Sequence, residues 1–218
     1  MSVTEYSFEH GISDCGHDGI APTLVIGGAV QERDFNERDL STVRGVVVVQ
    51  NGQRKGTRWR DLNLRMLFER LAPIEYLLIE FDGPVDLSDI GTQPKLRKLH
   101  AKCPDARVGS EHAFPAVQEA HVRWSADCTA RLLGSSVRDL EWLRPSIADL
   151  LPLAHLKGLE SLRVGLTSRL QSLRGLDALP KLFRLVAHDC QQLVEIGVEA
   201  TCLKPEFIAL HNCRNLSD

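Results

Sequence analysis

The sequence predicts a single α/β solenoid, a stack of about eight short parallel strands, and two observations support this. First, an apolar pattern recurs, with apolar residues at the first, fourth and sixth places of each copy. Second, the copies are almost evenly spaced. They begin at Val43, Ile74, Leu96, Val117, Val137, Leu159, Leu182 and, less regularly, Pro205, which gives spacings of 31, 22, 21, 20, 22, 23 and 23 residues. A repeat this short cannot bury its own apolar face, so neighbouring repeats must share one core.

The last two copies carry the most specific form of the pattern. In LFRLVAHDCQQL (182–193) and PEFIALHNCRNL (205–216), a Cys stands at the ninth place and a Leu follows three residues later. From Val43 to the C-terminus the chain therefore resembles the leucine-rich repeat family. That resemblance implies a horseshoe with a parallel sheet on its concave face. The middle copies depart from the family pattern at the ninth place, where they have Asp82, Pro104, Ser125, Pro145 and Thr167.

The pattern also predicts which side chains are buried. In a short strand the fourth and sixth residues point to the same side, and we expect that side to be the core. The Cys at the ninth place follows the strand, at the turn. We therefore interpret Cys190 and Cys213 as buried turn residues rather than as catalytic thiols.

Two helices are expected on the convex side of the stack. Leu64, Leu67, Phe68 and Leu71 have the i, i+3, i+4, i+7 spacing of an amphipathic helix, which we predict over Trp59 to Leu71, ending before Pro73. A shorter helix is predicted over Ile147 to Leu156, with Ser146 as its N-cap. The remaining convex segments are expected to be turns or short 3₁₀ pieces.

Residues 1–39 match no repeat, whereas residues 40–218 form one continuous repeat domain. We expect the first segment to cap the stack, with a strand within TLVIGGAV (Thr23 to Val30). The N-terminus has no basic region followed by an apolar run, and no stretch approaches the roughly 20 apolar residues of a membrane span. These features predict a cytoplasmic protein without a membrane partner.

Composition and motifs do not favour an enzyme. The net charge of −3 gives no general attraction to nucleic acid, and G-x-S-x-G, H-E-x-x-H and G-x-G-x-x-G are absent. One alternative is an enzyme or metal-binding protein that uses the N-terminal cluster of His10, Asp14, Cys15, His17 and Asp18. A third is a nucleic-acid binder that uses the basic stretch from Arg54 to Arg60. We expect no catalytic residue, metal or cofactor, and no nucleic-acid partner.

The surface of the sheet is the remaining candidate site. The third, fifth, seventh and eighth residues of each copy should project from it, in columns that mix charged and aromatic side chains. His100 and His121 are neighbours in one column, where a hydrogen-bonded pair is expected rather than a metal site. The predicted partner-binding residues are Tyr76, Phe81, Lys98, His100, Glu119, His121, Arg123, Trp124, Glu141, Leu143, Arg144 and Arg163.

The sequence thus predicts a protein–protein interaction module that binds its partner on the concave face. The resemblance implies an adaptor or an inhibitor, and in bacteria an immunity protein that covers a toxin's active site. Arg outnumbers Lys by 19 to 7, which is typical of a GC-rich bacterial genome. We also expect the sheet edge at the last repeat to be covered, either by a second copy in a homodimer or by the partner.

Overall fold

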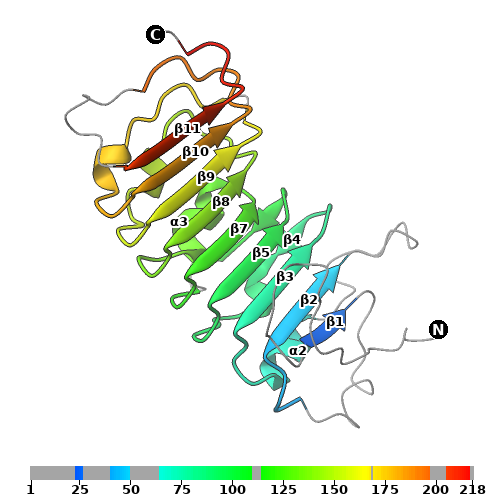
Figure 1. The fold of residues 1–218 in the computed structure, drawn as a ribbon. Coiled ribbons are helices and arrows are strands. Elements are labelled where there is room, and N and C mark those ends of the chain that lie inside the picture. Colours follow the sequence, from blue (N-terminus) through cyan, green and yellow to red (C-terminus); the bar gives the residue numbers. More distant parts are fainter. Residues whose placement is uncertain are drawn as a thin grey trace.

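The computed structural model describes residues 23–26, 40–49, 64–109, 114–167, 169–196 and 205–216. Their main feature is a nine-stranded sheet in which the strands lie side by side in chain order (Figure 1). The strands are β1 (Thr23–Ile26), β2 (Gly45–Val49), β3 (Tyr76–Glu80), β5 (Lys98–Lys102), β7 (Glu119–Arg123), β8 (Asp139–Leu143), β9 (Ser161–Gly165), β10 (Arg184–His188) and β11 (Phe207–His211).

Every neighbouring pair in this sheet is parallel, and the register follows the repeat. Each of the eight copies contributes one strand, which begins at the third place of the copy. Third places pair with third places, as in Lys98 with Glu119 and Arg184 with Phe207. The predicted parallel sheet is therefore confirmed, and β1 adds a strand within the segment predicted at Thr23 to Val30.

The core lies on one side of the sheet, because the first, fourth and sixth residues of each copy point there. Leu140, Trp142 and Leu162 are fully buried. The indole N–H of Trp142 donates to the carbonyl of Trp124 at 3.2 Å, so burial leaves this polar group satisfied. A fully buried Leu or Ile side chain contributes roughly 1.5–3 kcal/mol, so the repeated layers provide the main stabilisation.

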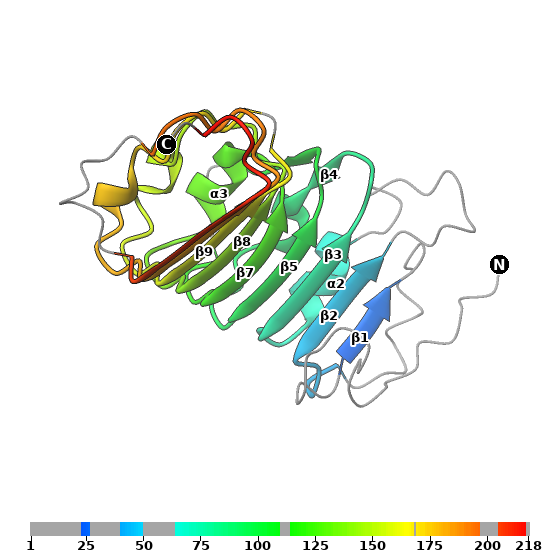
Figure 2. The same ribbon diagram turned by 45° about the horizontal axis from the view of Figure 1, so that its top comes forward.

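The helices and short elements lie on the core side, where Figure 2 shows α2 and α3 behind the strands. Helix α2 (Leu64–Arg70) buries Leu64, Leu67 and Phe68 as predicted, whereas the expected start at Trp59 is outside the described residues. The short elements are β4 (Val85–Asp86) and β6 (Ala106–Arg107), which form a second sheet, and the 3₁₀ turns η3 (Leu87–Ile90), η4 (Leu151–Leu153) and η5 (Leu176–Ala178). We call the other side of the main sheet the open face, formed by the third, fifth and seventh places.

The prediction for the second helix was wrong in two respects. Between Ile147 and Leu156 only η4 forms, because the backbone bonds sideways instead of along a helix: the carbonyl of Ala148 accepts from Gln171, and the N–H of Leu150 donates to Arg174. An α-helix, α3 (Ala126–Leu132), forms instead in the preceding repeat. Its N-cap is Ser125, whose hydroxyl accepts from the N–H of Cys128 at 3.3 Å.

The turn after the strand has two forms, and this overturns part of the surface prediction. In three copies the in–out alternation continues, so the eighth residue enters the core. Phe81, Cys103 and Trp124 are therefore at most 3% exposed, and the expectation that Phe81 and Trp124 project from the sheet was wrong. In the four later copies the eighth residue is left-handed, with φ of 54–56°, at Arg144, Leu166, Asp189 and Asn212. This breaks the alternation, and the ninth residue turns inward instead.

Tyr76 is also less accessible than predicted, although it lies on the open face. It packs with Val47 and Leu78 in a separate apolar cluster and is 4% exposed. Strands β2 and β3 carry apolar residues on the open face as well as on the core side, and these side chains pack against one another. Tyr76 is therefore an internal residue of the free chain.

Candidate protein-binding face

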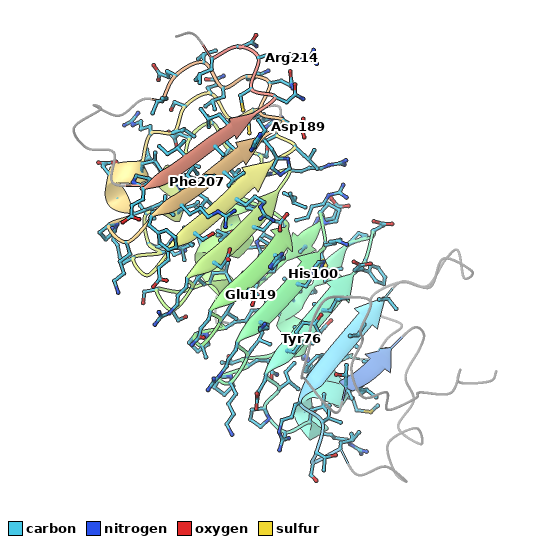
Figure 3. All side chains as sticks on the ribbon, in the orientation of Figure 1. Tyr76, His100, Glu119, Asp189, Phe207 and Arg214 are labelled. Carbon is cyan, nitrogen blue, oxygen red and sulfur yellow. The ribbon has the colours of Figure 1, made fainter. Side chains whose placement is uncertain are left out.

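Charged side chains of neighbouring strands form a ladder of ion pairs on the open face, and Figure 3 labels two of its members, His100 and Glu119. The Lys98 ammonium lies 3.0 Å from the Glu119 carboxylate, and the Arg163 guanidinium lies 3.1 Å from that of Glu141. Lys102 pairs in the same way with Glu80. These contacts follow from the register, because each pair occupies the same place on adjacent or nearby strands. The ladder orients long side chains that would otherwise be flexible.

The centre of the ladder is His121, which lies between two carboxylates. Its Nδ1 is 3.0 Å from Glu141 and its Nε2 is 3.3 Å from Glu119. Either neutral tautomer of the imidazole carries one N–H, which can donate to one of the two carboxylates. The contact with Glu141 links strands β7 and β8, whereas Glu119 lies on the same strand as His121.

His100 stacks on His121 and connects it to a further carboxylate. The ring centroids are 6.0 Å apart and the planes differ by 9°. The Nε2 of His100 is 3.7 Å from Glu80. The two rings therefore stack rather than hydrogen-bond to each other, and the described residues contain no group of three or more His, Cys, Asp or Glu arranged to hold a metal.

The pKa of the Glu119 carboxyl is changed by its position in the ladder. Partial burial alone would raise its pKa. The hydrogen bond from Lys98 and the positive charges of Lys98 and His121 outweigh that effect, so the pKa of Glu119 is lowered. The carboxylate is accordingly held in its charged form by its neighbours on the same face.

Three arginines near the ladder have no carboxylate partner in the described part of the chain. Arg123 and Arg144 come at the carboxyl ends of β7 and β8, beside the half-buried Leu143. Arg184 lies on β10, where its guanidinium carbon is 5.4 Å from the centroid of the Phe207 ring. Uncompensated guanidinium groups beside apolar side chains are typical of protein-binding surfaces.

Several of the most exposed apolar side chains are not among the predicted partner-binding residues. Phe207 is 49% exposed on the open face, and Phe183, one residue before β10, is 46% exposed. Leu166, in the turn after β9, is 43% exposed. The signal for Phe207 was available, since it occupies the third place of the last copy.

The structure thus divides the predicted partner-binding residues into three groups. It brings Lys98, His100, Glu119, His121, Glu141 and Arg163 together in the ladder. It places Arg123, Leu143 and Arg144 at the carboxyl ends of β7 and β8. It buries Tyr76, Phe81 and Trp124. The cluster at His10–Asp18 and the basic stretch at Arg54–Arg60 are outside the described residues.

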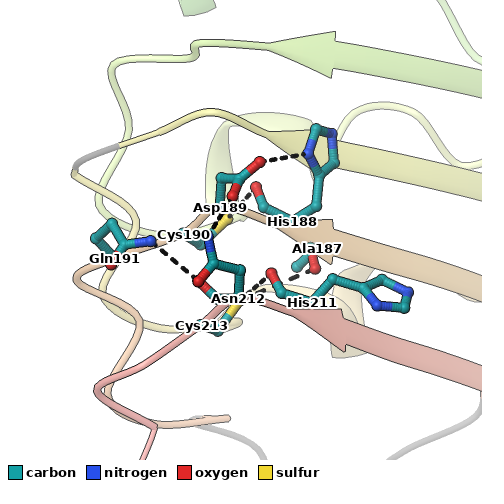
Figure 4. A network of polar contacts seen from close by, with 8 residues as sticks. All are labelled: Ala187, His188, Asp189, Cys190, Gln191, His211, Asn212 and Cys213. Carbon is teal, nitrogen blue, oxygen red and sulfur yellow. Dashed lines mark hydrogen bonds and ion pairs between the residues drawn. The ribbon is translucent and has the colours of Figure 1, made fainter.

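The two cysteines of the repeat pattern, Cys190 and Cys213, lie within a network of polar contacts at the turns after β10 and β11 (Figure 4). Asn212 donates to Asp189 at 2.6 Å, and Asp189 also contacts His188 at 3.3 Å. The thiol of Cys190 contacts the carbonyl of His188 at 3.5 Å. Burial, together with the nearby Cys213, raises the pKa of Cys190 to about 12, so the thiol stays protonated. The prediction that Cys190 is buried at the turn is confirmed. Cys213 is less buried.

Comparison with known proteins gives no independent assignment. No protein-family model and no curated protein matches this chain. In the described residues, no helix combines the length and the apolar character needed to cross a bilayer.

Proposed function

We propose that the chain is a solenoid of the leucine-rich repeat type and that its open face binds a partner protein. Three features support the solenoid: the eightfold pattern, one parallel strand per copy, and a core shared between consecutive copies. In such a stack the sheet surface is a broad recognition face, because the repeats present their side chains in regular columns.

The observation that carries the proposal is the composition of the open face between β5 and β11. A ladder of oriented charges reaches β9, and two strands further Phe207 is an exposed aromatic group whose ring contacts the guanidinium of Arg184. Charged groups give specificity and fast association, whereas an Arg–aromatic pair provides apolar contact area. The cytoplasmic location and the role of adaptor, inhibitor or toxin-immunity protein are parts of this proposal.

A capture experiment with matched charge reversals tests it. The chain is used as bait in extracts of the source cell, as wild type, as Arg163→Glu and as Arg107→Glu. Arg163 lies on the open face, whereas Arg107 lies on β6 on the opposite side and is exposed. We expect a partner that is retained by wild type and Arg107→Glu but reduced at least tenfold by Arg163→Glu. A partner retained equally by both variants would contradict binding on the open face.

The inhibitor role needs a separate test. The partner found above is expressed alone and together with the chain, and cell growth is measured. An inhibitor or immunity protein relieves toxicity of the partner, and Arg163→Glu should weaken that relief. A partner that is harmless alone favours the adaptor role.

A further inference from the structure

Strand β11 forms an open edge of the main sheet. In the described part of the chain it pairs with β10 alone. Its inward residues Ile208 and Leu210 are only half-buried, whereas Leu185 and Ala187, their neighbours on β10, are fully buried. Within the described residues the shared core is therefore not closed at this edge, and the backbone N–H and C=O groups on the outer side of β11 have no strand partner.

The edge also lacks the usual protection against pairing. Proteins block exposed edges with Lys, with inward-pointing charges, with Pro or with a bulge. The five residues of β11 are Phe-Ile-Ala-Leu-His, and they include no Lys, Arg, Asp, Glu or Pro. The strand is regular and pairs with β10 over its whole length. It is therefore able to accept a further strand.

The sequence of β11 is self-complementary about its central residue, Ala209. In an antiparallel pair centred there, Phe207 of each copy lies opposite His211 of the other, and Ile208 lies opposite Leu210. Ala209 meets its own equivalent, where a small side chain avoids a clash. Aromatic residues are thus paired with aromatic residues, aliphatic with aliphatic, and no like charges of Asp, Glu, Lys or Arg on this strand face each other.

We infer that a second copy of this chain pairs antiparallel with β11 across a two-fold axis through Ala209. Because opposite residues in an antiparallel pair point to the same side, the two open faces join into one surface. The half-buried Ile208 and Leu210 of the two copies then cover each other on the core side. Two five-residue strands form a small interface, so we expect a dissociation constant on the order of 10 μM.

Disulfide trapping tests this register directly. In the proposed dimer the two Ala209 residues have Cα atoms about 5 Å apart, which suits a disulfide. Ala209→Cys should therefore form a 209–209 linked dimer under mild oxidation, identified by peptide mass. The control is Val186→Cys, at the same place on β10, because Val186 pairs laterally with Ala209 within one chain. Wild type controls for the native cysteines.

Sedimentation equilibrium provides the second measurement, from 1 to 200 μM protein. Wild type should dimerise over this range, and Ala209→Arg should weaken the dimer at least tenfold because two guanidinium groups would meet at the axis. Leu166→Arg, a control at an exposed turn, should dimerise like wild type. Circular dichroism verifies that each variant is folded. A monomeric wild type at 200 μM, or a dimer without the 209–209 link, would overturn the inference.

Discussion

Replacement of Trp124 by alanine should destabilise the fold strongly, although Trp124 follows directly after a strand of the open face. The side chain is 3% exposed. Its indole N–H donates to the hydroxyl of Thr129 at 2.9 Å, and Thr129 is itself fully buried in α3. Trp124 therefore joins the end of β7 to the helix behind it.

The size of the effect follows from what alanine removes. Loss of a buried Trp side chain and the cavity left behind cost about 3–5 kcal/mol. Trp124→Phe keeps most of the ring volume and loses mainly the hydrogen bond to Thr129, so about 1–2 kcal/mol is expected. Phe207→Ala is the matched control at an exposed aromatic residue, where the unfolding free energy should fall by only about 0.5 kcal/mol.

Urea unfolding followed by far-ultraviolet circular dichroism measures these differences. With a slope of about 2.5 kcal/mol per molar urea, Trp124→Ala should lower the midpoint by roughly 1.2–2 M. The order of stability should be wild type, Phe207→Ala, Trp124→Phe and Trp124→Ala. A urea midpoint of Trp124→Ala within about 0.3 M of the wild-type midpoint would mean that about 0.8 kcal/mol or less is lost. That result would contradict the burial of the eighth residue in this copy.

Three further predictions concern the thiols, the charge ladder and one glycine. Burial raises the pKa of both Cys103 and Cys190 to about 12, so neither should react with iodoacetamide at pH 8 in the folded chain; rapid native labelling would contradict this. Because the pKa of Glu119 is lowered in the folded chain, the charged carboxylate stabilises the fold above the ordinary Glu pKa, and this stabilisation is lost as pH falls through the pKa of the folded state. The difference in unfolding free energy between wild type and Glu119→Gln should therefore shrink below about pH 4.3. A constant difference down to pH 2 would refute this. A Cβ on Gly165 would overlap the Nε2 of His188, so Gly165→Ala should cost about 1 kcal/mol and cost less in a His188→Ala background, whereas equal costs in both backgrounds would exclude this contact.

The strands could be predicted from the sequence because side-chain alternation and the repeat spacing set both their faces and their register. Lateral ion pairs follow from the same register: Lys98 and Glu119 both occupy the third place, and Glu141 and Arg163 both occupy the fifth. Contacts between different places, such as that of His121 with Glu119, depend on side-chain conformation. Repeat spacing carries no information about it.

The two forms of the turn were not predicted, because burial at the eighth place depends on one backbone angle. The polarity of the eighth and ninth residues does not separate the two forms, because Trp124 before Ser125 turns inward whereas Leu166 before Thr167 is left-handed and exposed. Asp and Asn, which also occupy this place, tolerate the left-handed conformation better than most residues. Within the left-handed group, only Asp189 and Asn212 therefore carry a sequence signal for this turn.

The missed helix assignment has a similar origin. Ile147, Leu150, Leu153 and Leu156 recur at intervals of three, and all four are buried. A period of three places side chains in line along a 3₁₀ turn or an irregular coil, whereas an α-helix needs 3.6. The strict interval was therefore the better guide, and the neighbouring Leu151, 42% exposed, does not belong to the apolar stripe.

The chain-order sheet has a consequence for how the protein folds. Paired residues are between 20 apart, as in Glu119 with Asp139, and 31 apart, as in Gly45 with Tyr76. Each strand pairs with a strand that is near in sequence, so the loops that close during folding are all short and the entropic costs of closing them are similar to one another. The 31-residue closure between β2 and β3 is the longest, and it separates the first two strands from the rest. We expect the central strands to form first and the first two to join last, so that pulling the molecule from its N-terminal side should release it in steps rather than all at once.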